Sequence, residues 1–181
     1  MTEPLVTERL TLVPLRVDHA EEMAAVLADP GLHTFIGGKP STVEELRSRY
    51  ARMVAGSTVP AISWCNWVIA LREEDPRRNP GRRPERRPRL VGYVQATIAP
   101  RRGDGRLVAE VAWVVGTEWQ GRGIAKEAAW GLVGWLEGRG IRALRAHIHP
   151  DHRASAAVAR SLGLEPTEEW HDGEVRWHRQ T

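Results

Sequence analysis

The chain has 181 residues, a net charge of +3 and a single cysteine, Cys65. This length predicts one domain over residues 1–181 with a sizeable core, and a lone cysteine excludes an internal disulfide framework and fits a reducing cytoplasm. No apolar run approaches the roughly 18 residues that span a bilayer, and the polar, acidic start "MTEPLVTERLTL" is unlike a signal peptide. Membrane and disulfide-scaffold classes are therefore not expected.

The basic character of the chain is concentrated in residues 72–89, "REEDPRRNPGRRPERRPR". Eight arginines and four acids give this segment a balance of +4, which exceeds the +3 of the whole chain. A proline at every fourth position favours extended, solvated backbone. We interpret the segment as an excursion between two strands, with contact to an acidic partner as the alternative. Arginines without interleaved aromatic residues give little support for nucleic-acid binding.

In chain order, residues 8–16, "ERLTLVPLR", alternate apolar and polar positions and predict a strand. Asp18 followed three residues later by Glu21 is a capping-box pattern, which predicts a helix to about Ala28. The "DPG" at 29–31 is expected to end that helix.

A second capping-box pattern, Ser41 with Glu44, predicts a helix that runs to about Val54. Residues 62–71 and 89–98 then read as two paired strands joined by the arginine-rich excursion.

A turn is expected at 102–106 and a buried strand at 107–116, followed by a glycine-rich loop. The loop opens a predicted helix of about 16 residues that "GRG" at 138–140 ends. Its apolar stripe should face a core, and consists of Ile124, Ala128, Leu132 and Leu136 with Ala125, Ala129 and Val133 beside them.

The last elements are a strand at 141–149, a short helix at 153–163, and a hairpin of 164–170 with 174–180 across "HDG". The whole order predicts an α+β fold, with a mixed sheet that is covered by helices on both faces.

The loop lies in "WQGRGIAKEAAW", residues 119–130. Glycine is costly in regular structure, so Gly121 and Gly123 at the start of a helix indicate a close approach to something. Free backbone amides and the positive end of the helix dipole suit a phosphate group. The P-loop string is absent, and a dinucleotide fingerprint would need a small residue where Lys126 stands. The remaining pattern is Q-x-x-G-x-[GA], here residues 120–125.

With these residues the sequence resembles the GNAT acyltransferase superfamily, and in particular its ribosomal-protein-acetyltransferase-like branch. "TERLTLVPLRVDHAEEM" looks like the opening strand and helix of that branch. "AEVAWVVGTEWQGRGIAKEAAWGLVGWL" resembles its central strand, pyrophosphate loop and helix, and "HIHPDHRASAAVARSLGLEP" the strand and helix that follow. The resemblance implies a twisted, mostly antiparallel sheet with a splayed central strand pair.

The resemblance implies acetyl-CoA as the donor. Backbone amides of the loop would bind the pyrophosphate, with added charge from Arg122 and Lys126, which are otherwise simply solvated. Val114 and Val115, on the splayed strand, would pair with the pantetheine amides, or form plain core, or both. The implied cofactor-binding residues are Val114, Val115, Gln120, Gly121, Arg122, Gly123, Ile124, Ala125, Lys126, His152 and Ser155.

On the acceptor side, the resemblance implies that a neutral amine attacks the thioester carbonyl. Glu110 interrupts the apolar strand 107–116 and is the leading candidate for the base, because a lone carboxylate there needs a partner or a purpose. The alternative is an acid paired with an arginine at the sheet edge. Glu174, which opens the last predicted strand, is a second candidate base.

Ser155 matches the serine of the N-x-x-S motif of the family, which implies contact with the cofactor and protonation of the leaving thiolate. The alternative is a serine that caps a helix start. His152 stands in place of the asparagine of that motif, and Leu164 and Glu165 stand where many members have a catalytic tyrosine, so tyrosine catalysis there is excluded.

Two further groups of side chains could form a site. His147, His149 and His152 suggest zinc, but no fourth ligand is placed and Cys65 is remote, so no metal is expected. Most of the eight tryptophans should be core, while Trp64 or Trp67 could line an acceptor pocket.

These features favour an acetyl-CoA-dependent N-acetyltransferase in the cytoplasm, a monomer or homodimer that acts on a small amine or a protein N-terminus. A non-catalytic acyl-CoA-binding module is the main alternative, and nucleic-acid binding through residues 72–89 is a third.

Overall fold

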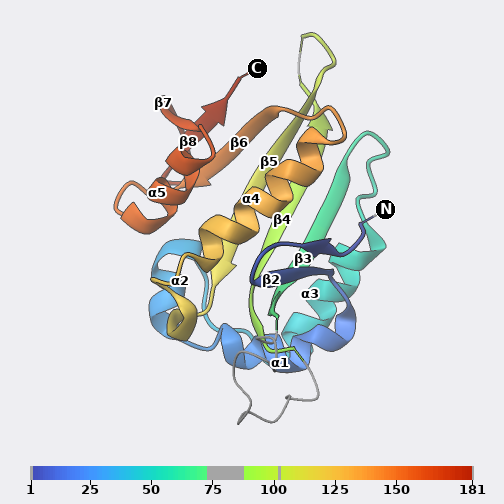
Figure 1. Cartoon of the computed structure of the whole chain (residues 1–181), viewed down its shortest axis with the longest axis vertical. Coiled ribbons are helices and arrows are strands. Elements are labelled where there is room, and N and C mark those ends of the chain that lie inside the picture. Colours follow the sequence, from blue (N-terminus) through green and yellow to red (C-terminus); the bar gives the residue numbers. More distant parts are fainter. Residues whose placement is uncertain (1, 73–87, 102, 181) are drawn as a thin grey trace.

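A computed structural model describes residues 2–72, 88–101 and 103–180. It is a mixed α/β fold around an eight-stranded sheet in the order β1-β2-β3-β4-β5-β6-β8-β7 (Figure 1). All neighbouring strands are antiparallel except β5 and β6, which are parallel. The strands are β1 Leu5–Val6, β2 Leu10–Pro14, β3 Ser63–Leu71, β4 Leu90–Pro100, β5 Leu107–Val115, β6 Ala143–Ile148, β7 Glu165–His171 and β8 Glu174–Arg179.

Helices cover both faces of the sheet, as expected (Figure 1). One core cluster joins the sheet to α4 and α5, and a second joins it to α1, α2 and α3. Every residue of the predicted apolar stripe on α4 is buried except Ala125, which is half-buried. The helices are α1 Ala20–Val26, α2 Pro30–Ile36, α3 Val43–Ala55, α4 Ile124–Glu137 and α5 Arg153–Ser161, with short 3-10 helices at Val17–His19 and Thr117–Trp119.

The starts of the first helices differ from the prediction. Asp18 does not cap α1: it lies in the preceding 3-10 helix and pairs with Arg16. The "DPG" at 29–31 does not simply end a helix, because the Asp29 side chain accepts a hydrogen bond from the Gly31 amide and Pro30 occupies the first helical position. An Asp followed by a Pro can cap the start of a helix as well as follow the end of one. The sequence prediction treats it only as an end and therefore omits helix α2.

The capping box of α3 is formed one residue later than predicted. Thr42 Oγ1 accepts from the Glu45 amide at 3.2 Å, and the Glu45 carboxylate accepts from the Thr42 amide at 2.8 Å. The sequence "STVEE" offers two overlapping versions of the same pattern, and the structure uses the second. The predicted hairpin at the end of the chain is present as β7 and β8.

The predicted splay lies between β5 and β6. These strands pair over residues 108–110 and 143–145, and the described parts of both strands have no further pairs beyond that point. The second half of β5 therefore has β4 on one side and an open gap on the other. The arginine-rich segment falls mostly outside the described residues.

Candidate active site

Two adjoining cavities lie beside the splayed half of β5. The loop pocket, about 260 Å³, lies toward α4, and the carboxylate pocket, about 350 Å³, lies toward β8. They share Ile36, Trp113, Val114, His152 and Ser155, so they form one continuous depression. The loop pocket is lined by every predicted cofactor-binding residue except Arg122: Val114, Val115, Gln120, Gly121, Gly123, Ile124, Ala125, Lys126, His152 and Ser155.

The glycine loop has a backbone that only glycine adopts readily. Gly121 and Gly123 have φ of 74° and 76°, in the left-handed region, and Gly123 is the residue that immediately precedes α4. An added Cβ would have nothing within 4 Å at Gly121 and would meet only the end of Arg9 at Gly123, so the space above the loop is open. The first amides of α4 have no intrahelical acceptor, and they begin at this open space.

Arg9 holds this loop in place through contacts that no sequence motif indicates. Its Nη1 donates to the Arg122 carbonyl at 3.0 Å and its Nε donates to Glu127 Oε2 at 2.7 Å. Thr7 Oγ1 donates to the other Glu127 oxygen at 2.6 Å. Burial alone would raise the pKa of Glu127, but the hydrogen bonds from Thr7 and Arg9 hold this pKa below its ordinary value. Arg9 therefore offsets a carboxylate that would otherwise repel an anion at the start of α4.

The two cations predicted near the loop differ in position. Lys126 is exposed and lines the loop pocket, so it can add charge there. The Arg122 guanidinium lies 5.0 Å from the centroid of the Trp119 ring, which borders the loop pocket, but Arg122 itself does not line that pocket.

The β4–β5 ladder decides which backbone groups of β5 are available at the gap. The Gly116 amide donates to the Val91 carbonyl at 2.9 Å, and the register pairs Val114 with Tyr93. Antiparallel ladders alternate by residue, so the backbone groups of Val114 also point at β4. A Cβ placed on Gly92 would lie 2.1 Å from the Val114 carbonyl oxygen, which agrees with that direction.

By the same alternation, the backbone groups of Trp113 and Val115 point into the gap. The Gln120 side-chain amide donates to the Val115 carbonyl at 3.0 Å, from the gap side. Gln120 thus holds the start of the loop against the end of β5. Val114 lines both pockets. Trp113 joins Val115 as a strand residue whose backbone faces the gap, although the Val115 carbonyl already accepts from Gln120.

Glu110 lies in the carboxylate pocket, opposite two cations or potential cations. Its Oε1 is 3.4 Å from His147 Nδ1 and its Oε2 is 3.8 Å from Arg145 Nη1. The side chain of Glu110 remains 47% exposed, so it is reachable by a ligand. Glu174 lines the same pocket from the start of β8. Both candidate bases therefore face one cavity.

His152 and Ser155 stand where the two pockets meet. His152 precedes α5, its Nδ1 accepts from the Ser155 amide at 3.5 Å, and its ring stacks on Phe35 with centroids 4.3 Å apart. Burial, with a smaller contribution from His149, lowers the pKa of His152 below its usual 6.5, which favours the neutral, accepting ring. The Ser155 hydroxyl has no hydrogen-bond partner among the described residues, so capping is done by His152.

The structure also shows where the histidines considered for a metal site and the tryptophans considered for an acceptor pocket lie. In the described part of the chain, no three His, Cys, Asp or Glu side chains come together in a way that could hold a metal ion. Trp67 is fully buried and borders a third cavity, between the sheet and helices α1, α2 and α3, whereas Trp64 is 43% exposed and lines neither that cavity nor the two beside β5. Across the described residues, no helix combines the length and the apolar character that crossing a bilayer requires.

A sheet that opens between two parallel strands beside a glycine-rich helix start defines the fold of an acyltransferase class. The family model for the acetyltransferase (GNAT) domain matches residues 9–165, and the chain belongs to this family. No curated protein matches the sequence.

Among solved structures, the fold is similar to an acetyltransferase from Salmonella typhimurium that modifies the N-terminal serine of ribosomal protein L7/L12 (17% identity, 98% of each chain, TM-score 0.72). It is also similar to RimL, a ribosomal L7/L12 α-N-protein acetyltransferase, in complex with coenzyme A (18% identity, 98% of this chain and 97% of that one, TM-score 0.72). A third is the microcin C7 self-immunity acetyltransferase MccE with acetyl-CoA and AMP (14% identity, 96% and 93%, TM-score 0.69). At these identities the likeness shows the fold alone.

Proposed function

We propose that this protein transfers an acetyl group from acetyl-CoA to a primary amine by direct attack on the thioester. The observation that carries the proposal is the junction of the two pockets at Val114 and Ser155. One pocket offers a site for an anionic, extended donor, and the other offers carboxylates for an amine. Among structures of similar fold, RimL is a complex with coenzyme A and MccE a complex with acetyl-CoA.

The loop pocket offers the groups that the donor would need. Amides of the loop would bind the pyrophosphate above Gly121 and Gly123, where the glycines leave the space free. Lys126 adds positive charge from the first turn of α4. The backbone groups of Trp113 and the Val115 amide, which face the gap, would pair with the pantetheine amides, as one further strand does on a sheet edge. The acetyl group would then reach the junction.

At the junction, the amine must lose a proton before or as it attacks. Glu110, directly or through a water, takes this proton, the amine nitrogen bonds to the carbonyl carbon, and the carbon–sulfur bond breaks. The Ser155 hydroxyl is free of other partners among the described residues and can donate to the leaving thiolate. An α-amine, with a pKa near 8, needs little help at neutral pH, whereas a lysine, with a pKa near 10.4, needs much more. An α-amine or a small amine of similar basicity suits a carboxylate base.

The test is release of free thiol from acetyl-CoA with a panel of amines, together with detection of the acetylated amine by mass spectrometry. Amine-dependent thiol release supports the proposal. Tight binding of acetyl-CoA without thiol release for any amine would identify a non-catalytic acyl-CoA-binding module instead.

A further inference from the structure

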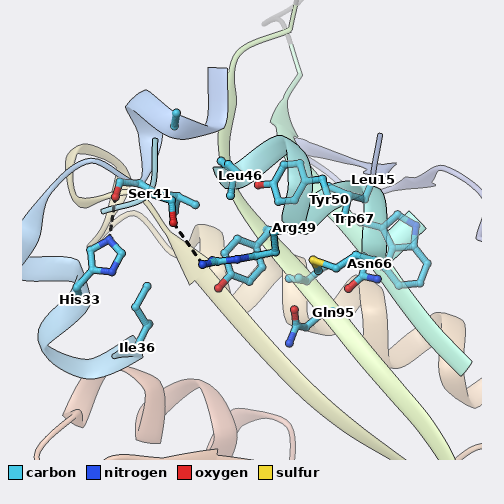
Figure 2. Close-up of a pocket in the computed structure, with 15 residues that line it drawn as sticks. Leu15, His33, Ile36, Ser41, Leu46, Arg49, Tyr50, Asn66, Trp67 and Gln95 are labelled. Carbon is cyan, nitrogen blue, oxygen red and sulfur yellow. Dashed lines mark hydrogen bonds between the residues drawn. The ribbon is translucent and has the colours of Figure 1, made fainter. Parts of the chain in front are cut away.

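A third cavity, the helix pocket, lies between the sheet and helices α1, α2 and α3 (Figure 2). Its volume is about 160 Å³. Much of its wall is apolar, with Leu15, Leu27, Leu46 and Met53 among the lining residues. A cavity of about 150 Å³ with an apolar lining accommodates benzene, so the helix pocket has room for an apolar group of about six carbon atoms.

One buried polar group in this pocket lacks a partner. Tyr50 is 4% exposed, and its hydroxyl forms no hydrogen bond with the described part of the chain. Burial raises the pKa of Tyr50, so the group remains a phenol that can donate a proton to an acceptor. Buried hydroxyls are almost always hydrogen-bonded in folded proteins. An unpaired one in a cavity wall indicates a ligand that supplies the acceptor.

Arg49 adds a second donor at the same pocket. Its Nη2 donates to Ser41 Oγ at 3.3 Å (Figure 2), and no carboxylate of the described residues lies within ion-pair distance. By contrast Arg47, two residues earlier, pairs with Glu21. The described lining of the helix pocket contains no Asp or Glu. Arg49 is thus a cation at a pocket that provides no anion for it.

The helix pocket continues into the carboxylate pocket, because both are lined by Ile36, Tyr93 and Gln95. Asn66 on β3 pairs with Gln95 on β4. Two residues further along β4, on the same face, Thr97 pairs with Glu110 on β5. Two strand spacings and two residues along a strand separate the Cα atoms of Asn66 and Glu110, which is about 12 Å. One end of the combined cavity carries three carboxylates beside four histidines, and the other end carries Arg49 and no carboxylate of the described residues.

We propose that the acceptor is a primary amine whose apolar body ends in a carboxylate. The amine lies at Glu110, the apolar body extends over Gln95 into the helix pocket, and Arg49 and Tyr50 donate to the carboxylate. Charge-assisted hydrogen bonds from a guanidinium suit a carboxylate better than a neutral amide. A short peptide with a free C-terminus and an ω-amino acid share this chemistry; the α-amine of the peptide, with a pKa near 8, is easier to deprotonate than the lysine-like amine of the ω-amino acid. The inference rests on the proposed acetyl transfer.

The first experiment measures kcat/KM for two matched pairs of acceptors. The pair 8-aminooctanoate and 8-aminooctanamide represents ω-amino acids, and trialanine and its C-terminal amide represent peptides. We expect the carboxylate of at least one pair to be preferred by about tenfold, which corresponds to one charged hydrogen bond. The pair with the larger ratio identifies the source. Equal values within both pairs overturn the inference and leave the proposed function intact.

Variants connect this preference to the pocket. Arg49→Gln should bring the acid-to-amide ratio close to one, while Arg52→Gln, an exposed arginine on the same helix outside the pocket lining, should keep it. Tyr50→Phe should lower the ratio by severalfold because one donor is lost. If the ratio survives in Arg49→Gln, the assignment of the carboxylate site is wrong.

A binding measurement separates this inference from acetyl transfer. Calorimetric titration of the full chain with octanoate and octanamide, neither of which has an amine, should give about tenfold tighter binding of octanoate, and Arg49→Gln should remove the difference. If octanoate is preferred but no amine is acetylated, the proposed function fails while the carboxylate site stands. If octanoate and octanamide bind equally, or neither binds, the carboxylate site is rejected.

Discussion

Glu110 on β5 and His147 on β6 face each other where the two strands begin to part, with Oε1 and Nδ1 3.4 Å apart. Arg145, which pairs with Glu110 in the register of the two strands and lies two residues before His147, approaches the same carboxylate. These contacts fix the carboxylate at the entrance of the gap, yet about half of its surface is still open to a ligand. The pairing that the sequence left as an alternative to catalysis is therefore compatible with it.

Replacement of Glu110 by Gln should lower turnover on an α-amine by about 10²–10³-fold, in line with general-base contributions. The affinity for acetyl-CoA should change little, because Glu110 lines the carboxylate pocket and not the loop pocket. Raising the pH should partly restore the rate, since solvent then deprotonates the amine, and the rescue should be larger for an amine with a pKa near 8 than for a lysine-like one. Steady-state kinetics from pH 6 to 10 provide the measurement.

Glu174→Gln is the matched control, because Glu174 lines the same cavity from β8. A fully active Glu110→Gln beside an inactive Glu174→Gln would transfer the role of base to Glu174. Full activity in both variants would show that deprotonation of the acceptor needs neither carboxylate.

Acetyl-CoA should raise the melting temperature, with about 2.7 kcal/mol of stabilisation at 100 times its dissociation constant. Gly123→Val should abolish this shift, because a branched side chain would fill the open space above the loop and the left-handed φ would be lost. Gly140→Val is the matched control: its φ of 75° is similar and its Cβ would also meet nothing within 4 Å, but it lies beyond the far end of α4. A Gly123→Val variant that folds and keeps the ligand shift would refute the loop assignment.

Arg9→Gln should weaken acetyl-CoA binding by about tenfold, since the loop loses a hydrogen bond at Arg122 and the Glu127 carboxylate loses its cation. Arg16→Gln is the control, because Arg16 also pairs with a carboxylate, that of Asp18, but does not line the loop pocket. Calorimetric titration of both variants decides the matter. Equal affinity in wild type and Arg9→Gln would mean that the loop holds its form without this contact.

The elements of the fold that could be predicted from the sequence are those that depend on residues close together in the chain. The loop and α4 follow from paired glycines before an apolar stripe, and the strands follow from alternation. Helix α2 was missed because Asp29 and Pro30 carry both a stop and a start signal. The Arg9–Glu127 contact joins residues 118 positions apart in sequence, and no local pattern reports it.

The open backbone groups of β5 were beyond sequence reasoning for a related reason. Which residues of β5 face the gap depends on the register of its ladder with β4, which pairs Val114 with Tyr93, and the composition of the two strands does not specify that register. A shift of this register by one residue would exchange the β5 backbone groups that face β4 with those that face the gap. The strand could therefore be found from its composition, but the assignment of Trp113 in addition to Val115 needed the structure.

Gly92→Ala should destabilise the protein by about 1–3 kcal/mol, because the added Cβ would lie 2.1 Å from the Val114 carbonyl oxygen and force β4 and β5 apart. Gly134→Ala is the control: it lies in exposed α4 surface with nothing within 4 Å of its Cβ, and alanine there should be neutral or stabilising. Urea denaturation of the three proteins tests this. Equal midpoints for wild type and Gly92→Ala would show that the two strands do not approach as closely as described.

Stability should also depend on pH through His152. Burial first, and His149 second, lower the pKa of this ring below the value of 6.5 that it has when unfolded. The unfolded chain then binds more protons below about pH 6.5, so the contribution of His152 is present above that pH and is lost as the pH falls through the folded pKa. Protonation would also remove the Nδ1 acceptor from the Ser155 amide.

His152→Asn keeps a side-chain acceptor before α5 but removes the titration. At pH 7.5 the variant should be less stable than wild type by about 0.5–1.5 kcal/mol, because the stacking on Phe35 is lost. This difference should shrink as the pH is lowered from 7.5 to 5, since only the wild type is penalised by protonation of residue 152. Urea midpoints at four pH values across this range give the result, with Asp151→Asn as a control for an exposed neighbouring charge. A stability difference that stays constant with pH would show that His152 titrates alike in the folded and unfolded chains.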